Sequence, residues 1–139
     1  MILGEIDNND KLIEQLRYLS ASENLFHAYI FEGDSCVDKA LLADCFIKAI
    51  LCENDKGEGC ETCISCNKIN HGNHEDIIYV ETDGKSIKDD AVEELQNRLK
   101  KKPFFGDRNI AVIKQADTMT VRAQNRLLKT LEEPPQGTI

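Results

Sequence analysis

The sequence predicts an α/β domain in which helices flank a parallel sheet and a small metal-binding module is inserted. Two observations lead to this fold class. Short apolar runs without polar alternation take turns with segments of helical periodicity, as in sheets whose strands are buried beneath crossover helices. Four closely spaced cysteines then interrupt this alternation in a polar segment. The length of 139 residues suits one domain with one core.

Three apolar runs are the predicted strands: AYIF at residues 28–31, IIYV at 77–80 and IAVI at 110–113. Each fits a strand that is buried on both faces. The sequence ends with Gly137, which can form a turn, and residues 138–139, which look like the start of a fourth strand. We therefore expect residues 1–139 to form the N-terminal part of a domain that is incomplete at its C-terminal end.

Four segments have helical periodicity: about 9–22, 37–51, 89–101, and a final one that begins at a Thr120 cap and ends before two prolines. Lysines at the end of the third segment and Pro103 after it are typical of a helix C-terminus. The residues predicted to face the core are Leu12, Leu16 and Leu19; Leu42, Cys45, Phe46, Ala49 and Ile50; Val92, Leu95 and Leu99; and Ala123, Leu127, Leu128 and Leu131.

The formal net charge is −8, with 41% apolar and 30% charged residues, which is typical of a soluble globular chain. An acidic chain does not attract nucleic acid through its overall field, because phosphate neutralisation needs clustered Lys and Arg. No apolar run approaches the length of a membrane span, and the N-terminus lacks the basic region of a secretory signal. A cytoplasmic protein without membrane contact is the expectation.

The cysteines have the spacing Cys52-x7-Cys60-x2-Cys63-x2-Cys66. Two overlapping C-x-x-C steps and a fourth thiol nearby suit a tetrahedral thiolate site for zinc. The surrounding residues have too few large apolar side chains to form a core, and a metal supplies such a segment with folding energy. Four protein ligands leave no open position, so we expect a structural zinc module at residues 52–74.

Three other interpretations of the cysteines stay open. They could be free thiols in a loop, or ligands of an iron–sulfur cluster, although the ferredoxin run would continue with a further Cys and a Pro after Cys66. His71 or His74 could also replace one thiol. Cys36 and Cys45 lie outside the cluster, and Cys45 is expected to be a core residue.

A phosphate-binding loop reads G-x-x-x-x-G-K-[ST], and the segment that begins at Gly33 departs from this motif. Lys39 is in place, but Asp38 stands where the second Gly belongs and Ala40 where the hydroxyl residue belongs. A carboxylate about 4 Å from a phosphate charge costs about 4 kcal/mol at an effective dielectric of about 20, close to a thousand-fold in affinity. Taken alone, the segment is best explained as an ordinary strand–helix loop.

The ends of the predicted strands also lack the acidic residues that an ATPase needs. Lys114 and Gln115 follow the run 110–113, where such a site places Asp and Glu to hold Mg²⁺ and to orient water. We expect that ATP and Mg²⁺ do not bind productively, and that Gly33 and Lys39 are relics of a phosphate loop.

Several segments together resemble the bacterial clamp-loader AAA+ subunits of DNA polymerase III. The similar segments are HAYIFEG at 27–33, the four cysteines, GNHEDIIYVE at 72–81, KSIKDD at 85–90 and QADTMTVRAQNRLLKTLEEPPQGT at 115–138. The resemblance implies a P-loop NTPase fold of the RecA-like AAA+ type and assigns the four cysteines to a zinc module. It also implies that a lid, a collar and an arginine motif lie downstream.

This family has two similar subunit types. Gamma/tau subunits hydrolyse ATP, whereas delta-prime subunits often have degraded motifs and help to hold the subunit ring together. The altered residues Asp38, Ala40, Lys114 and Gln115 point to the delta-prime type. The resemblance then implies a non-hydrolysing subunit of the polymerase complex. Its partners would be gamma/tau and delta subunits and, through the complex, the sliding clamp and primer-template DNA.

Two alternative functions stay open: a gamma/tau-like ATPase with unusual motifs, and a zinc-dependent interaction module on a degenerate NTPase scaffold. Arg122, Arg126 and Lys129 are the local basic candidates for contact with DNA or a neighbouring subunit, although such residues are usually just solvated.

Overall fold

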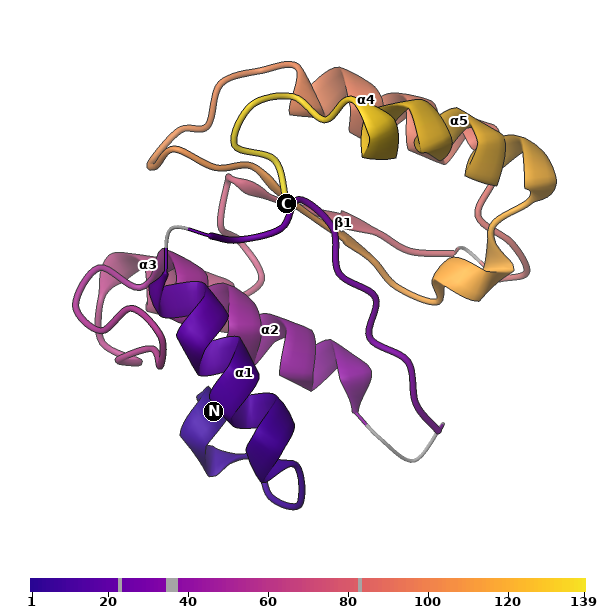
Figure 1. Cartoon of the computed structure of the whole chain (residues 1–139). Coiled ribbons are helices and arrows are strands. Elements are labelled where there is room, and N and C mark those ends of the chain that lie inside the picture. Colours follow the sequence, from indigo (N-terminus) through magenta and orange to yellow (C-terminus); the bar gives the residue numbers. More distant parts are fainter. Residues whose placement is uncertain (23, 35–37, 83) are drawn as a thin grey trace. The chain divides into compact units, whose positions relative to one another are not determined.

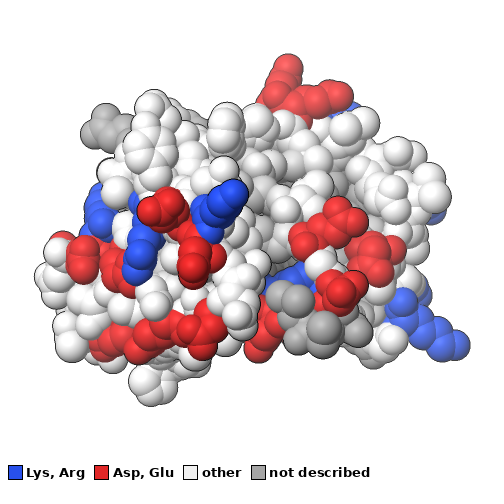
Figure 2. All heavy atoms as spheres, turned by 60° about the horizontal axis from the view of Figure 1, so that its bottom comes forward, with Lys and Arg blue, Asp and Glu red and all other residues white. Residues whose placement is uncertain are grey.

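The computed structural model describes residues 1–22, 24–34, 38–82 and 84–139. The chain forms two compact units. The helical unit consists of Met1–Phe26 and Ile30–His74, and the sheet unit of His27–Tyr29 and Glu75–Ile139. Within the described ranges, no helix is both long and apolar enough to cross a membrane. Figure 2 shows one face, on which acidic and basic side chains are interleaved and acidic ones predominate.

The helical unit contains a short 3₁₀ turn, η1 (Leu3–Glu5), and the helices α1 (Asp10–Ala21), α2 (Lys39–Leu51) and α3 (Ile64–Asn70). Helix α2 is its centre, since η1, α1 and α3 all contact it (Figure 1). The C-terminal half of α2 is buried, and Leu3 is completely buried. The apolar face predicted for residues 37–51 is therefore confirmed, except that Leu42 is only half-buried.

The sheet unit contains β1 (Ile77–Val80), α4 (Asp89–Leu99), β2 (Ile110–Ile113), a 3₁₀ turn η2 (Ala116–Thr118) and α5 (Val121–Glu132). The two strands pair in parallel. Helices α4 and α5 lie side by side on one face of this sheet (Figure 1). The buried residues that join them to it are Ile78, Val80, Ile87, Val92, Leu95, Leu99, Ala123 and Leu127.

Residues 138–139, at the C-terminal end of the chain, add a third segment to the sheet beside β2. Thr138 forms a parallel bridge with Asn109, and the backbone N–H of Ala111 donates to the carbonyl of Ile139 at 2.8 Å. The prediction that residues 138–139 begin a further strand is therefore supported. Gly137, with φ of 77°, makes the turn before them in a conformation that favours glycine.

The strand predicted at residues 28–31 is wrong in this structure. None of these residues lies in a strand, and Ile30 is 91% exposed. Residues 28–31 cannot pair with β2, because both of its edges are occupied: the N–H of Ile110 donates to the carbonyl of Asp76 on the β1 side, and that of Ala111 to Ile139 on the other. An apolar run becomes a strand only where a sheet edge is within reach of its backbone groups.

The predicted face of the first helix is misplaced. Ile13, Leu16 and Ser20 are buried, whereas Leu12 is exposed and Leu19 half-buried. Successive helix residues are about 100° apart, so a shift of one residue turns the buried face by that angle. The prediction relied on the spacing of the leucines and therefore missed that Ile13 is buried.

Two leucines of the last helix also differ from the prediction. Ala123 and Leu127 face α4 and are buried, but Leu128 and Leu131 are 50% and 40% exposed. Leu128 directly follows Leu127 and therefore lies about 100° away from the buried face. Only one stripe of α5 packs on the core of the sheet unit.

Candidate metal centre and phosphate loop

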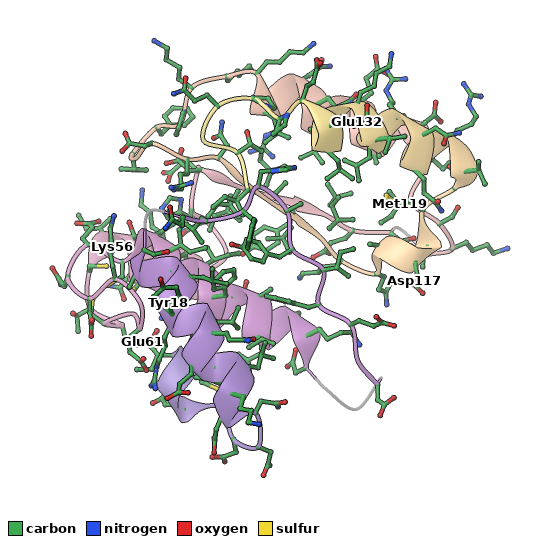
Figure 3. All side chains as sticks on the ribbon, in the orientation of Figure 1. Tyr18, Lys56, Glu61, Asp117, Met119 and Glu132 are labelled. Carbon is green, nitrogen blue, oxygen red and sulfur yellow. The ribbon has the colours of Figure 1, made fainter. Side chains whose placement is uncertain are left out.

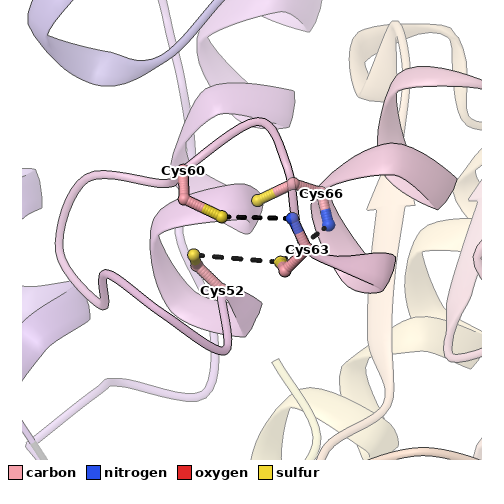
Figure 4. Close-up of side chains that lie close together, drawn as sticks. All are labelled: Cys52, Cys60, Cys63 and Cys66. Carbon is pink, nitrogen blue, oxygen red and sulfur yellow. Dashed lines mark hydrogen bonds between the residues drawn. The ribbon is translucent and has the colours of Figure 1, made fainter.

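Four thiols converge in the helical unit (Figure 4). The Sγ atoms of Cys52, Cys60, Cys63 and Cys66 all lie within 4.8 Å of one another, and those of Cys52 and Cys63 are 3.9 Å apart. In a tetrahedral thiolate site with metal–sulfur bonds of about 2.3 Å, the sulfurs are about 3.8 Å apart. The group could therefore hold a metal ion, and its donor set fits zinc.

Two helix ends position these thiols. Cys52 is the residue at which α2 ends, and its thiol accepts the backbone N–H of Asp55 at 3.2 Å. Cys63 caps the start of α3, where it accepts the N–H of Cys66 at 3.4 Å. Helix α3 was not predicted, because only two isoleucines mark it. Cys63 and Cys66 lie three residues apart and place two of the four thiols in the first turn of this helix.

Cys60 lies on the more accessible side of the cluster. Its thiol accepts the hydroxyl of Thr62 at 3.3 Å and the backbone N–H groups of Thr62 and Cys63 at 3.5 and 3.2 Å. These donors, led by the Thr62 hydroxyl, lower the pKa of Cys60 to about 5. Hydrogen bonds to a thiolate are what a metal-ligating sulfur requires from its surroundings.

The buried thiols shift in the opposite direction. Burial raises the pKa of Cys66 to about 12 and also raises the pKa of Cys52. A buried thiolate is costly unless a positive charge compensates it. A divalent cation supplies that charge, so the burial of three of the four sulfurs suits a closed structural site rather than reactive cysteines.

A polar contact holds the turn between Cys60 and Cys63. Glu61 has a left-handed backbone with φ of 61°, which is unfavourable for a residue with a side chain. Its carboxylate accepts Nζ of the buried Lys48 at 2.8 Å and Nδ2 of Asn70 at 3.3 Å. Figure 3 labels Glu61 within this segment. The side chain thus fixes a strained turn to α2 and α3.

A second polar contact fixes the loop that precedes Cys60. The carboxylate of Glu58 receives two hydrogen bonds from the guanidinium of Arg17 and one from the backbone N–H of Gly4, the latter at 2.7 Å. The hydrogen bond from Arg17 lowers the pKa of Glu58. Helix α1 and η1 are thereby joined to the cysteine segment. Arg17 and Gly4 lie 41 and 54 residues from Glu58 along the chain, so the sequence offered no signal for these contacts.

The remaining candidate ligands do not belong to the group. Within the described residues, the cluster contains four cysteines and neither His71 nor His74. His71 is exposed, and its Nδ1 is 2.7 Å from the carbonyl of Asn67. Cys45 is a buried core residue, as predicted, and burial raises the pKa of its thiol. Cys36 lies outside the described residues.

The phosphate-loop remnant is described at Gly33, Asp34 and from Asp38 onward, while residues 35–37 lie outside the described part. Nζ of Lys39 donates to the carbonyls of Gly33 and Asp34 at 3.0 and 3.2 Å. The carboxylate of Asp38 accepts the N–H of Leu41 at 2.9 Å and caps α2. Ala40 is exposed in the first turn of α2. The cation and a helix N–H that a phosphate would use are thus both engaged.

Lys114 and Gln115 directly follow β2 in the sheet unit. Nζ of Lys114 pairs with the carboxylate of Glu81 at 2.7 Å and lies 5.2 Å from the ring centroid of Tyr79. Gln115 has a left-handed backbone with φ of 51°, and its carbonyl accepts the hydroxyl of Thr118 at 2.7 Å. A cation therefore occupies the end of β2, and the carboxylate that follows β1 is paired with it.

The basic residues of α5 are mostly engaged with α4. Arg122 lies 3.5 Å from the carboxylate of Asp89, and Arg126 lies 3.3 Å from that of Glu93. Gln96 also donates to the carbonyl of Arg126 at 2.8 Å. Lys129 is exposed. These contacts give Arg126 a role in packing that the sequence did not indicate, whereas the side chain of Arg122 is 85% exposed. Contact of either residue with DNA or a neighbour stays a prediction.

Comparison with known proteins gives a consistent set of relatives. A family model described as "DNA polymerase III, delta subunit" matches residues 8–139. DNA polymerase III subunit delta' of Bacillus subtilis is 36% identical over 136 residues, which are 97% of this chain and 41% of the relative. DNA polymerase III subunit delta' of Pseudomonas aeruginosa is 32% identical over 116 residues, which are 81% of this chain and 35% of the relative.

Subunits of a second type are also similar. DNA polymerase III subunit tau of Bacillus subtilis is 27% identical over 136 residues, which are 97% of this chain and 24% of the relative. A solved gamma subunit-related protein of Thermotoga maritima is 23% identical, with a TM-score of 0.46, and the match covers 54% of this chain and 26% of the Thermotoga chain. The chain spans less than half the length of these relatives. Because the family model matches residues 8–139, the chain belongs to the DNA polymerase III delta subunit family.

Proposed function

We propose that this chain is part of a delta-prime subunit of a bacterial clamp loader, which acts in the cytoplasm. Such a subunit does not hydrolyse ATP. It assembles with gamma/tau and delta subunits into the ring that loads the sliding clamp onto primer-template DNA. The identity of 36% to a curated delta' subunit, compared with 27% to the tau subunit of the same organism, supports this type.

The observation that carries the proposal is the capping of α2 by Asp38. The Asp38 carboxylate accepts the Leu41 N–H at 2.9 Å, so a negative charge already occupies the helix N-terminus at which a P-loop NTPase binds phosphate. Lys39 donates to loop carbonyls, and Ala40 offers no hydroxyl to Mg²⁺. A nucleotide would have to displace these three hydrogen bonds and would meet a carboxylate.

The cysteine cluster has a structural role in this proposal. Zinc bound by Cys52, Cys60, Cys63 and Cys66 joins the end of α2 to the start of α3 and folds the polar loop between them. The module at 52–74 then gives the AAA+ base domain a fixed surface. No step of ATP chemistry passes through it, because all four ligand positions are protein thiolates.

Reconstitution tests the proposal. The whole subunit that contains this chain would be mixed with the gamma/tau and delta subunits of its own species and passed through a size-exclusion column. We expect one stable complex that contains all three subunits and that loads clamps onto primed DNA only when this subunit is present. A subunit that stays separate, or a complex that loads equally well without it, would exclude the proposal.

A gamma/tau-like ATPase is the second candidate, since tau subunits match the same part of the chain. It differs in one measurable property, the Mg²⁺-dependent hydrolysis of ATP by the isolated subunit. A rate that depends on Lys39 would favour this candidate. The control is Lys56→Ala, which removes an exposed lysine from the cysteine segment.

A further inference from the structure

The loop between α4 and β2 presents two aromatic side chains to solvent. Phe104 is 81% exposed and Phe105 is 57% exposed. Large apolar side chains that are exposed next to each other are unusual on a soluble protein and often mark a binding surface. The pair lies within the sheet unit, in the loop that leads from α4 to β2 in Figure 1.

The same loop carries a concentrated positive charge. Between residues 98 and 108 the chain has five basic residues and one acidic residue, although its formal net charge is −8. Lys100, Lys101 and Lys102 are all exposed. A local basic segment is what an acidic chain needs in order to bind a polyanion. We name residues 98–108, which are the last two residues of α4 and the loop that follows it, the aromatic–basic loop.

The buried side chains of Asp76 and Asn109 hold the backbone of the aromatic–basic loop in place. The carboxylate of Asp76, which is only 2% exposed, accepts the N–H groups of Phe104, Phe105 and Gly106, the last two at 2.9 and 3.4 Å. The side chain of Asn109 donates to the carbonyl of Lys101 at 2.7 Å. A loop that is already fixed loses little further conformational entropy on binding.

We propose that the aromatic–basic loop is a binding platform for single-stranded nucleic acid. Sequence-independent sites of this kind combine basic side chains that follow the phosphates with aromatic rings on which bases stack. Phe104 and Phe105 supply the rings, and the three lysines supply the charge. Duplex nucleic acid keeps its bases stacked inside the helix, so the rings would contribute only to the single-stranded form.

This loop is a better candidate than the basic residues of α5. There Arg122 and Arg126 are paired with carboxylates of α4, and two of the exposed side chains beside them are leucines rather than aromatic rings. The inference concerns a property of this chain alone. It holds whichever type of clamp-loader subunit contains the chain, and it does not depend on the proposed function.

The experiment uses the 139-residue chain and a fluorescein-labelled single-stranded oligothymidylate of about 15 nucleotides, read by fluorescence anisotropy at about 50 mM salt. We expect saturable binding with a dissociation constant below about 100 µM. The double variant Phe104→Ala, Phe105→Ala should bind about tenfold or more weakly, since a stacked base contributes about 1–3 kcal/mol. Tyr18→Ala is the control, because Tyr18 is a similarly exposed aromatic residue on α1 (Figure 3).

The lysines are tested through the salt dependence of binding. Replacing Lys100, Lys101 and Lys102 by Gln should reduce the slope of log K against log salt by about 2, which corresponds to about 0.7 for each lost contact. The matched control replaces Lys11, Lys56 and Lys85, which are also exposed, and should leave the slope unchanged. Circular dichroism confirms that all variants are folded.

Four outcomes would overturn the proposal. They are no saturable binding at about 50 mM salt, equal binding by the double phenylalanine variant, equal affinity for a duplex of the same length, and preferential binding to anionic lipid vesicles. The last outcome would assign the same chemistry to a membrane surface instead.

Discussion

The carboxylate of Asp38 accepts the backbone N–H of Leu41 at 2.9 Å and so caps the helix that a phosphate loop would direct at a nucleotide. The residue that departs from the phosphate-loop motif therefore has a structural task. In a nucleotide-binding loop this position is a glycine, and the free N–H groups of the helix face the phosphate. Here one of them already has an anionic partner within the chain.

The cap predicts a measurable stability difference. Asp38→Ala should lower the free energy of unfolding by about 1 kcal/mol, because the first turn of α2 loses its side-chain acceptor. Asp38→Asn keeps an acceptor oxygen and should cost much less. Urea unfolding followed by circular dichroism measures both variants. Equal stability of Asp38→Ala and the parent chain would show that the carboxylate does not cap α2 in solution.

The cysteine cluster predicts one zinc ion per chain. Cys66→Ser should abolish zinc retention and unfold the polar loop, because a structural zinc site supplies much of the folding free energy of its segment. Cys45→Ala removes a buried cysteine outside the cluster and should leave the zinc content unchanged. Elemental analysis gives the ratio of zinc to protein. Iron in place of zinc, or a Cys66→Ser protein with full zinc, would contradict the assignment.

The ion pair between Glu61 and Lys48 predicts that substitutions at these two residues have non-additive effects on stability. Glu61→Gln leaves the buried ammonium of Lys48 without its carboxylate and should cost about 1–3 kcal/mol of stability. Lys48→Met removes the charge itself, so the double variant should be more stable than the sum of the single effects implies. Denaturant unfolding of the four proteins gives the interaction free energy. A value near zero would mean that the ion pair does not hold the cysteine turn.

The contact between Glu58 and Arg17 predicts that the protein loses stability as the pH falls. The hydrogen bonds from Arg17 lower the folded-state pKa of Glu58 below that of the unfolded chain, which is about 4.3. The resulting stabilisation is fully present above that unfolded pKa and is lost as the pH falls through the lower, folded pKa. Since Arg17 is partly exposed, we expect about 1 kcal/mol at neutral pH.

The measurement is the stability difference between the parent chain and Glu58→Gln at several pH values. It should be largest near pH 7 and shrink toward zero as the pH falls below about 4. The zinc content is measured at each pH, because loss of the metal in acid would unfold the loop that carries Glu58. A difference that does not change with pH would exclude the ionised Glu58 as its source.

Regular elements with strong local patterns could be predicted from the sequence. The strands at 77–80 and 110–113 have the predicted bounds, and the helix beginning at Asp89 buries the predicted Val92, Leu95 and Leu99. Each of these patterns arises from neighbouring residues. The spacing of the cysteines likewise predicted that four thiols meet, since short C-x-x-C steps leave the chain few other arrangements.

Features that depend on distant residues could not be predicted. Residues 28–31 have the composition of a strand but gain no sheet edge, and nothing in the run itself reveals this. The contact of Glu58 with Arg17 and the contact of Asp76 with the Phe104 backbone join residues 41 and 28 positions apart. Their side chains are ordinary charged residues in the sequence, and only the fold brings each to its partner.

Calorimetric titration of the whole subunit with Mg²⁺ and ATP tests the central claim most directly. With Asp38 capping α2 and Lys39 held by loop carbonyls, we predict no binding tighter than about 1 mM, which corresponds to about −4 kcal/mol. The gamma/tau subunit of the same species is the positive control in the same cell. Saturable Mg²⁺-dependent binding in the micromolar range that Lys39→Ala abolishes would contradict the account.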